Sequence, residues 1–139
     1  MTLKDKSKES VRLAYSLAES GYYNLAANRF YYSVFQKTLF FAEKQHNYDY
    51  LKLDESLKKG THNSLIHHIS FKISEARQKD PGNKKLNDIG NIQHEFSELK
   101  KLREKADYQE VDITEEDIEY IKEKLKDFNT KYSTLVQFI

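Results

Sequence analysis

The residues best suited to chemistry lie in the stretch KKLREKADYQEVDITEED, residues 100–117. Arg103 follows Leu99 and precedes Ala106 at steps of four and three residues, so a helix here turns the guanidinium toward the core. Asp107 lies one turn later on the same face. We expect Arg103 to be partly buried with Asp107 as its first partner, because an unpaired buried charge is costly.

A second arginine has a similar placement. Arg29 shares a helical face with Leu25, Tyr32 and Gln36, and we expect it also to need an acidic partner. If the two helices pack together, five polar side chains converge on one cluster: Arg29, Tyr32, Arg103, Asp107 and Tyr108. Two interpretations are open, a structural network that fixes helix register or a functional site.

Histidine is the residue type best suited to proton transfer near neutral pH. His62 opens a predicted helix and is the best candidate for that role, although a histidine at this position is also typical of capping or packing. His67 and His68 are adjacent, so they point about 100 degrees apart on a helix. No His/Glu set has metal-ligand spacing, and we expect neither a metal ion nor a cofactor.

Composition narrows the class of protein. A chain of 139 residues is long enough for one domain with its own core, residues 1–139. The absence of cysteine excludes disulfides and thiolate chemistry and fits a reducing cytoplasm. No apolar run approaches the roughly 20 residues that span a bilayer, and no signal-peptide core follows the charged start. We expect a soluble cytoplasmic protein with no membrane contact.

The charge distribution gives only a weak functional signal. Residues 61–85 carry five Lys/Arg against two acids, and residues 109–139 carry four against eight. The basic stretch could face a phosphate backbone, or its charges could simply be solvated. Its excess is far below that of a dedicated nucleic-acid binder.

Hydrophobic periodicity predicts an all-α chain. Helices are expected over residues 3–20, 22–45, 62–78 and 85–107 and from Thr114 to the end, with Gly21 as a stop and Thr61 as an N-cap. The helix of residues 22–45 is apolar around most of its circumference and should be central. Thr114 and Asp117 form a capping-box pattern. A compact bundle of about five helices follows.

Three stretches of this sequence resemble, in order, the signatures of small HEPN proteins (higher eukaryotes and prokaryotes nucleotide-binding). They are SGYYNLAANRFYYSVFQKTLFF, THNSLI and LREKADYQEVDITEEDIE. The family pattern has an arginine before a paired tyrosine, a histidine opening the next helix, and an arginine shortly before Ala-Asp-Tyr and a capped final helix. The resemblance covers about residues 20–125.

The resemblance implies a helical bundle that usually forms a homodimer, in a toxin-antitoxin, phage-defence or stress setting. It also implies RNA or a nucleotidyltransferase as possible partners. Catalytic HEPN proteins generally use Arg, four to six residues, then His, and no arginine here is followed by histidine at that spacing. We therefore favour an RNA- or partner-binding module. The alternative is a divergent metal-independent endoribonuclease, with Arg103 stabilising charge and His62 as acid or base.

Overall fold

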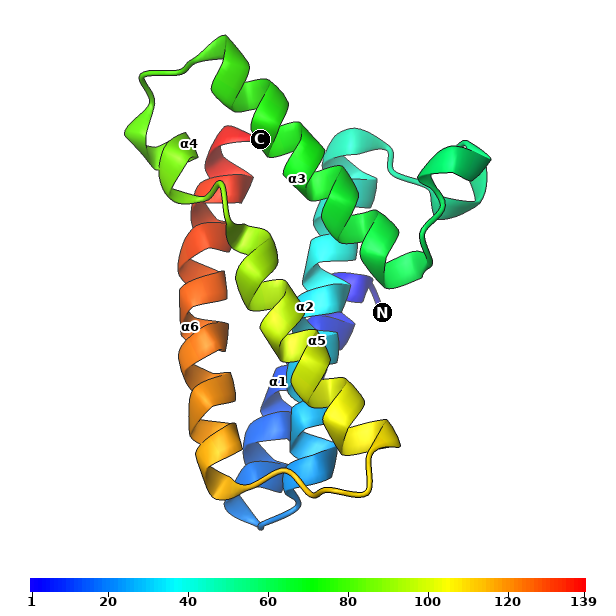
Figure 1. Ribbon diagram of the computed structural model, residues 1–139, viewed down its shortest axis with the longest axis vertical. Coiled ribbons are helices and arrows are strands. Elements are labelled where there is room, and N and C mark those ends of the chain that lie inside the picture. Colours follow the sequence, from blue (N-terminus) through cyan, green and yellow to red (C-terminus); the bar gives the residue numbers. More distant parts are fainter.

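The computed structural model describes all residues, 1–139, and contains helices and no strands. The helices are α1 (Leu3–Glu19), α2 (Tyr23–His46), α3 (Thr61–Lys79), α4 (Lys84–Asp88), α5 (Ile92–Tyr108) and α6 (Glu115–Phe138). Two 3-10 turns, η1 (Tyr50–Lys52) and η2 (Glu55–Leu57), interrupt the connection between α2 and α3. Figure 1 shows a bundle in which α3 crosses one end and this connection protrudes beside it. The predicted all-α bundle is confirmed.

Helix α2 is the centre of the bundle, because α1, α3, α5 and α6 all pack against it. Its apolar side chains face several neighbours at once, which is why they occur around most of its circumference. The fully enclosed ones include Ala26, Phe30, Tyr31 and Val34. They belong to a single core cluster that draws on every long helix. The prediction of a central second helix is therefore confirmed.

Local end signals position the helices as the sequence predicts. Gly21 has φ of 82° and ends α1, while the amide of Tyr22 donates to the carbonyl of Leu17 at 2.9 Å. At the start of α6, the amide of Asp117 donates to Oγ1 of Thr114, and the amide of Thr114 donates back to the Asp117 carboxylate, both at 3.0 Å. The predicted stop and the predicted capping box are both confirmed.

The prediction of one helix over residues 85–107 is wrong, because the chain turns between α4 and α5. The amides of Gly90 and Ile92 donate three residues back, to Asn87 and Ile89. A Cβ on Gly90 would lie 2.6 Å from Nη1 of Arg77, so glycine permits a close approach to α3. The apolar side chains on either side of this tighter turn are buried. The helical spacing of apolar residues therefore continues through the turn, and the sequence pattern did not reveal the break.

The predicted N-cap at Thr61 is also wrong. Thr61 is the first residue of α3, and Gly60 occupies the cap position with φ of 86° and no side-chain hydrogen bond. Ser64 instead fastens the loop before α3, since its Oγ accepts the amide of Lys59 at 2.7 Å and donates to the carbonyl of Leu57 at 3.2 Å. The hydroxyl inside the first turn therefore organises the entry to α3, and places His62 at its start.

Candidate functional site

Arg103 lies at the centre of a polar cluster between α2 and α5. The residue is 7% exposed, and its Nη1 lies 3.6 Å from Oδ2 of Asp107. Its guanidinium carbon lies 5.3 Å from the ring centre of Tyr31 and 5.7 Å from those of Tyr32 and Tyr108. The predicted burial and the predicted Asp107 partner are both confirmed. Three aromatic rings supply much of the remaining stabilisation of the charge.

The guanidinium is held mainly by charge and ring contacts rather than by hydrogen bonds. Its Nε is enclosed and has no hydrogen-bond partner. Asp107 keeps a second contact, because Nδ2 of Asn28 donates to its carboxylate at 3.0 Å. The ion pair thus joins α5 to α2 through a neutral amide. A buried donor without a partner is costly, so the geometry around Arg103 is maintained at some expense of stability.

Arg29 joins this cluster without an acidic partner. Its Nε donates to Oδ1 of Asn28 at 2.8 Å, and its guanidinium carbon lies 5.1 Å from the ring centre of Tyr32. No carboxylate lies within ion-pair distance of it, so the expectation of an acid here is wrong. Arg29 is only half-buried, and an amide oxygen and a ring are the partners of its guanidinium.

His62 reaches the same cluster from α3. Its Nδ1 lies 2.5 Å from the hydroxyl of Tyr31, and its ring centre lies 4.4 Å from that of Phe35. Burial lowers the pKa of His62, and the nearby charges of Arg103 and Lys100 lower this pKa further. The imidazole is therefore mainly neutral at pH 7.

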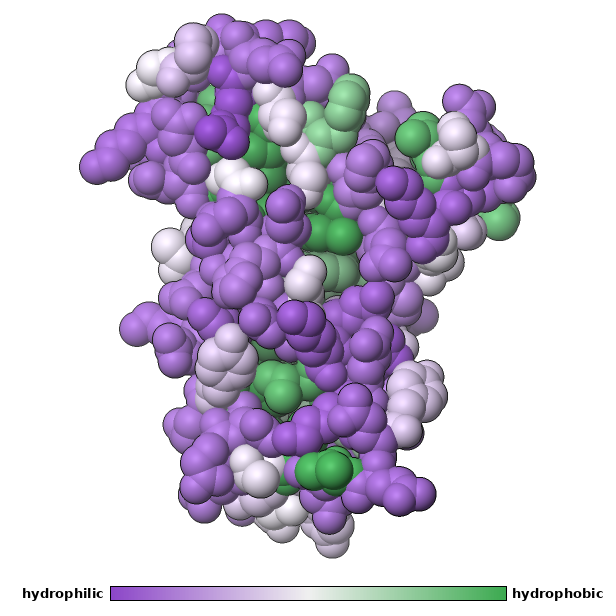
Figure 2. Space-filling model, viewed as in Figure 1, coloured by the Kyte–Doolittle hydropathy of each residue, from purple (hydrophilic) through white to green (hydrophobic).

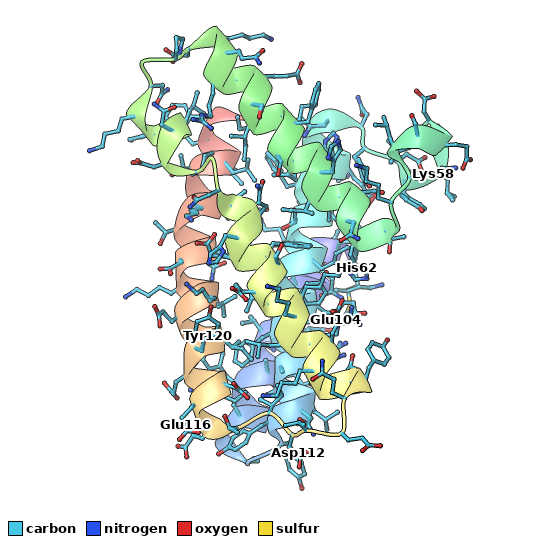
Figure 3. The ribbon with its side chains drawn as sticks, in the orientation of Figure 1. Lys58, His62, Glu104, Asp112, Glu116 and Tyr120 are labelled. Carbon is cyan, nitrogen blue, oxygen red and sulfur yellow. The ribbon has the colours of Figure 1, made fainter.

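Tyr31 is the contact that His62 and Arg103 share. It is fully buried, and burial raises its pKa, with Arg103 opposing the effect. Because the phenol stays protonated, its hydroxyl can donate to Nδ1 of His62, which leaves the ring hydrogen on Nε2. Figure 3 shows His62 at the start of α3 and Glu104 on α5, whose carboxylate acts on the pKa of both His62 and Tyr31.

We call the whole set the Arg103 cluster: Asn28, Arg29, Tyr31, Tyr32, His62, Arg103, Asp107 and Tyr108. The structure brings together all six residues singled out in the sequence, and adds Asn28 and Tyr31. The sequence contains a signal for both additions, since Asn28 precedes Arg29 and Tyr31 is half of the tyrosine pair. Neither has a helical spacing that distinguishes it from an ordinary core or surface position.

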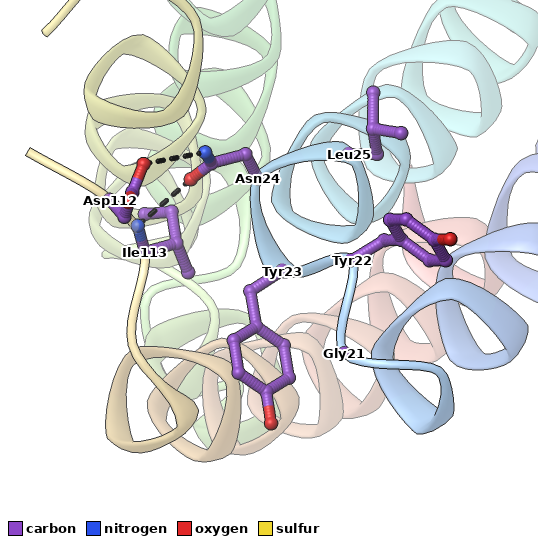
Figure 4. A pocket seen from close by; sticks show the side chains of 7 residues that line it. All are labelled: Gly21, Tyr22, Tyr23, Asn24, Leu25, Asp112 and Ile113. Carbon is purple, nitrogen blue, oxygen red and sulfur yellow. Dashed lines mark hydrogen bonds between the residues drawn. The ribbon is translucent and has the colours of Figure 1, made fainter. Parts of the chain in front are cut away.

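The connection from α5 to α6 is fastened beside this cluster. Nδ2 of Asn24 donates to Asp112 at 3.0 Å, and the amide of Ile113 donates to Oδ1 of Asn24 at 2.8 Å (Figure 4). A pocket of about 350 Å³ lies here, between the start of α2 and Asp112. Asn24 lies one turn before Asn28 on α2. Asn28 holds Asp107, and Asn24 holds the segment that follows Asp107.

The Arg103 cluster lies outside the principal surface pockets. The five principal surface pockets are lined by other residues, and none includes Arg103 or His62. No group of three or more His, Cys, Asp or Glu side chains is arranged to hold a metal ion. No helix combines the length and the apolar composition needed to cross a bilayer. The groups available for chemistry at the cluster are the neutral imidazole of His62, the enclosed guanidinium of Arg103, the half-buried guanidinium of Arg29 and the carboxylate of Asp107.

Comparisons with family models, with curated proteins and with solved structures find no match to this chain. The resemblance to HEPN proteins therefore depends on the three sequence motifs alone. The Arg103 cluster draws on all three motifs, since α2, α3 and α5 each contribute residues to it.

Proposed function

We propose that this protein is a HEPN-like binding module that holds a protein partner in a toxin-antitoxin, phage-defence or stress system. The observation that supports this most is the enclosure of Arg103. Three tyrosine rings and Asp107 surround the guanidinium, and no principal pocket opens onto it. A charge held in this way fixes how α2 and α5 pack and leaves little room for a substrate.

The partner surface that we propose lies beside the cluster, at the end of the bundle where α1 meets α2 and α5 meets α6 (Figure 1). Large apolar side chains are exposed there: Tyr22, Leu25, Tyr108 and Val111. Tyr108 is 76% exposed and lies over Arg103, so the buried arginine orients an exposed aromatic ring. Tyrosine and arginine are the residue types that dominate protein interfaces.

The charges of this surface favour a protein over RNA as the partner. Asp107, Glu110 and Asp112 accompany the exposed apolar side chains, and carboxylates repel a phosphate backbone. Figure 2 shows a mainly hydrophilic face with small, separate hydrophobic areas, which suits reversible association. A second copy of the chain is the first partner that we propose, and a nucleotidyltransferase is the next.

Light scattering tests this proposal. At tens of micromolar, we expect the wild type to have about twice the monomer mass of 16.5 kDa. Leu25→Glu should return the protein to monomer mass, because it places a charge in the proposed interface. Leu51→Glu is the control, because Leu51 is also an exposed leucine, at 80% against 58% for Leu25, but lies on η1, outside the surface. A wild-type monomer, or equal effects of the two substitutions, would contradict a self-associating surface.

A divergent metal-independent endoribonuclease is the second candidate, supported by the contact of His62 and Arg103 with the same Tyr31 ring. A neutral imidazole can accept the proton of a ribose 2′-hydroxyl, and a guanidinium can stabilise the charge of a phosphorane. Cleavage of single-stranded RNA by the wild type, lost in both Arg103→Ala and His62→Ala with unchanged melting temperatures, would establish this candidate and displace the binding module.

A further inference from the structure

A second pocket, lined by none of the residues of the Arg103 cluster, lies between α1, α2 and α6. Its volume is about 370 Å³. Apolar side chains form much of its wall, and lysines from two helices surround it. The lining residues used below, which we call the lysine pocket, are Val11, Phe40, Phe41, Tyr132 and Val136 with Lys4, Lys8, Lys37 and Lys44.

The charge of the lysine pocket is unbalanced. Its lining contains four lysines and no acidic residue. None of these lysines forms an ion pair, although nine ion pairs occur elsewhere in the chain. Four positive charges that converge on a concave surface without a carboxylate create a positive potential that favours an anion.

Lys37 is the most constrained of the four. Its Nζ donates to the amide oxygen of Asn129 at 2.8 Å and lies 4.7 Å from the ring centre of Tyr132, so both of its partners are neutral. Burial lowers the pKa of Lys37. Lys131, on the same helix as Asn129, is different, because its Nζ lies 2.6 Å from the carboxylate of Glu95. The chain therefore provides a carboxylate for half-buried Lys131 and none for half-buried Lys37.

The apolar wall of the lysine pocket includes a core side chain and a hydrogen-bonded tyrosine. Phe41 is buried in the core, and the hydroxyl of Tyr132 donates to the backbone carbonyl of Lys37 at 3.2 Å. The hydroxyl of Tyr132 is therefore bonded to the backbone, and its ring forms part of the pocket wall. Lys44 lies on the same side, with its Nζ 6.0 Å from the ring centre of Phe40. The pocket thus combines aromatic surface with positive charges that have no ion-pair partner.

We propose that the lysine pocket binds a small organic anion, with one phosphate or carboxylate head on an apolar body of about the size of a fused aromatic ring pair. The head lies beside Lys37, where it supplies the missing counter-charge, and the more exposed lysines reach it from the rim. The body packs on Phe40, Phe41 and Val136. A volume of about 370 Å³ is at the small end of ligand sites, which favours a small molecule over a peptide segment.

Calorimetric titration with four probes tests both parts of the ligand. We expect 1-naphthyl phosphate and 1-naphthoate to bind saturably, and the tighter of the two identifies the head group. Inorganic phosphate lacks the body and 1-naphthol lacks the charge, so each should bind at least about tenfold more weakly than the better anion. Binding of 1-naphthol as tight as that of both anions, or no saturable binding of either anion at low millimolar concentration, would overturn the proposal.

Two substitutions test the location of the site. Lys37→Met removes the charge with little change in length, and should weaken binding of the better anion about tenfold. Lys79→Met is the matched control, since Lys79 is exposed at the end of α3 and outside the pocket, and it should bind like the wild type. Val136→Trp should also weaken binding by filling the pocket from an exposed position while keeping every lysine.

The fold of each variant is checked by circular dichroism, and Val136→Trp keeps the test valid if Lys37→Met fails to fold. Equal affinity of the wild type, Lys37→Met and Val136→Trp would overturn the assignment of the site. Sedimentation with phosphatidylglycerol vesicles, without binding of either naphthyl anion, would assign the lysines to a lipid surface and also overturn it.

Discussion

Replacing Arg103 by alanine separates a structural role of the cluster from a catalytic one. The substitution removes the partner of Asp107 and three cation–ring contacts, and leaves a space between the rings of Tyr31, Tyr32 and Tyr108. Breaking a buried ion pair costs about 3 to 5 kcal/mol. The Asp107 side chain is 26% exposed and keeps its bond to Asn28, which places the cost near the lower end. We expect a loss of about 3 kcal/mol of unfolding free energy.

Urea denaturation followed by circular dichroism measures this loss. Arg103→Ala should lower the urea midpoint without a large change in slope. Arg103→Ala combined with Asp107→Ala should lose less than the sum of the single losses, by about 1 kcal/mol, because the second substitution removes the unpaired carboxylate. Lys101→Ala is the control: this exposed neighbour forms an ion pair with Glu98 at 3.9 Å and should cost less than about 0.5 kcal/mol.

An unchanged midpoint would refute the reasoning. If Arg103→Ala were as stable as Lys101→Ala, the rings and Asp107 would not depend on the guanidinium for their packing. Additive losses at Arg103 and Asp107 would likewise show that their ion pair contributes nothing, despite its 3.6 Å geometry.

Two further predictions concern a cap and a half-buried histidine. Thr114→Ala should cost about 1 kcal/mol, because the hydroxyl that accepts the amide of Asp117 is lost, and an unchanged urea midpoint would contradict it. Burial and the nearby His46 lower the pKa of His68 to about 4, below its unfolded value of about 6.5. The unfolded chain therefore binds more protons in this window, and stability should fall as the pH falls from 6.5 toward 4. His68 is only half-buried, so about 1 to 2 kcal/mol is expected; His68→Gln should flatten the profile, and exposed His94→Gln should not.

The sequence alone determined the local features of this protein. Helix stops, the capping box of α6 and the apolar stripes depend on residues within a few positions of one another, so their spacing predicts them. The burial of Arg103 and its pairing with Asp107 belong to the same group, because a side chain and its partner one turn later share a helical face.

Only the tertiary structure decided how these pieces meet. The turn at Gly90 depends on Arg77, which belongs to another helix, and the hydrogen bond from Tyr31 to His62 joins residues 31 positions apart. Arg29 has an amide and a ring where an acid was expected, because half-burial leaves its charge in contact with water. Helical periodicity states which face a residue occupies. It does not state which residue of another helix lies opposite, since that depends on the packing of whole side chains across the bundle.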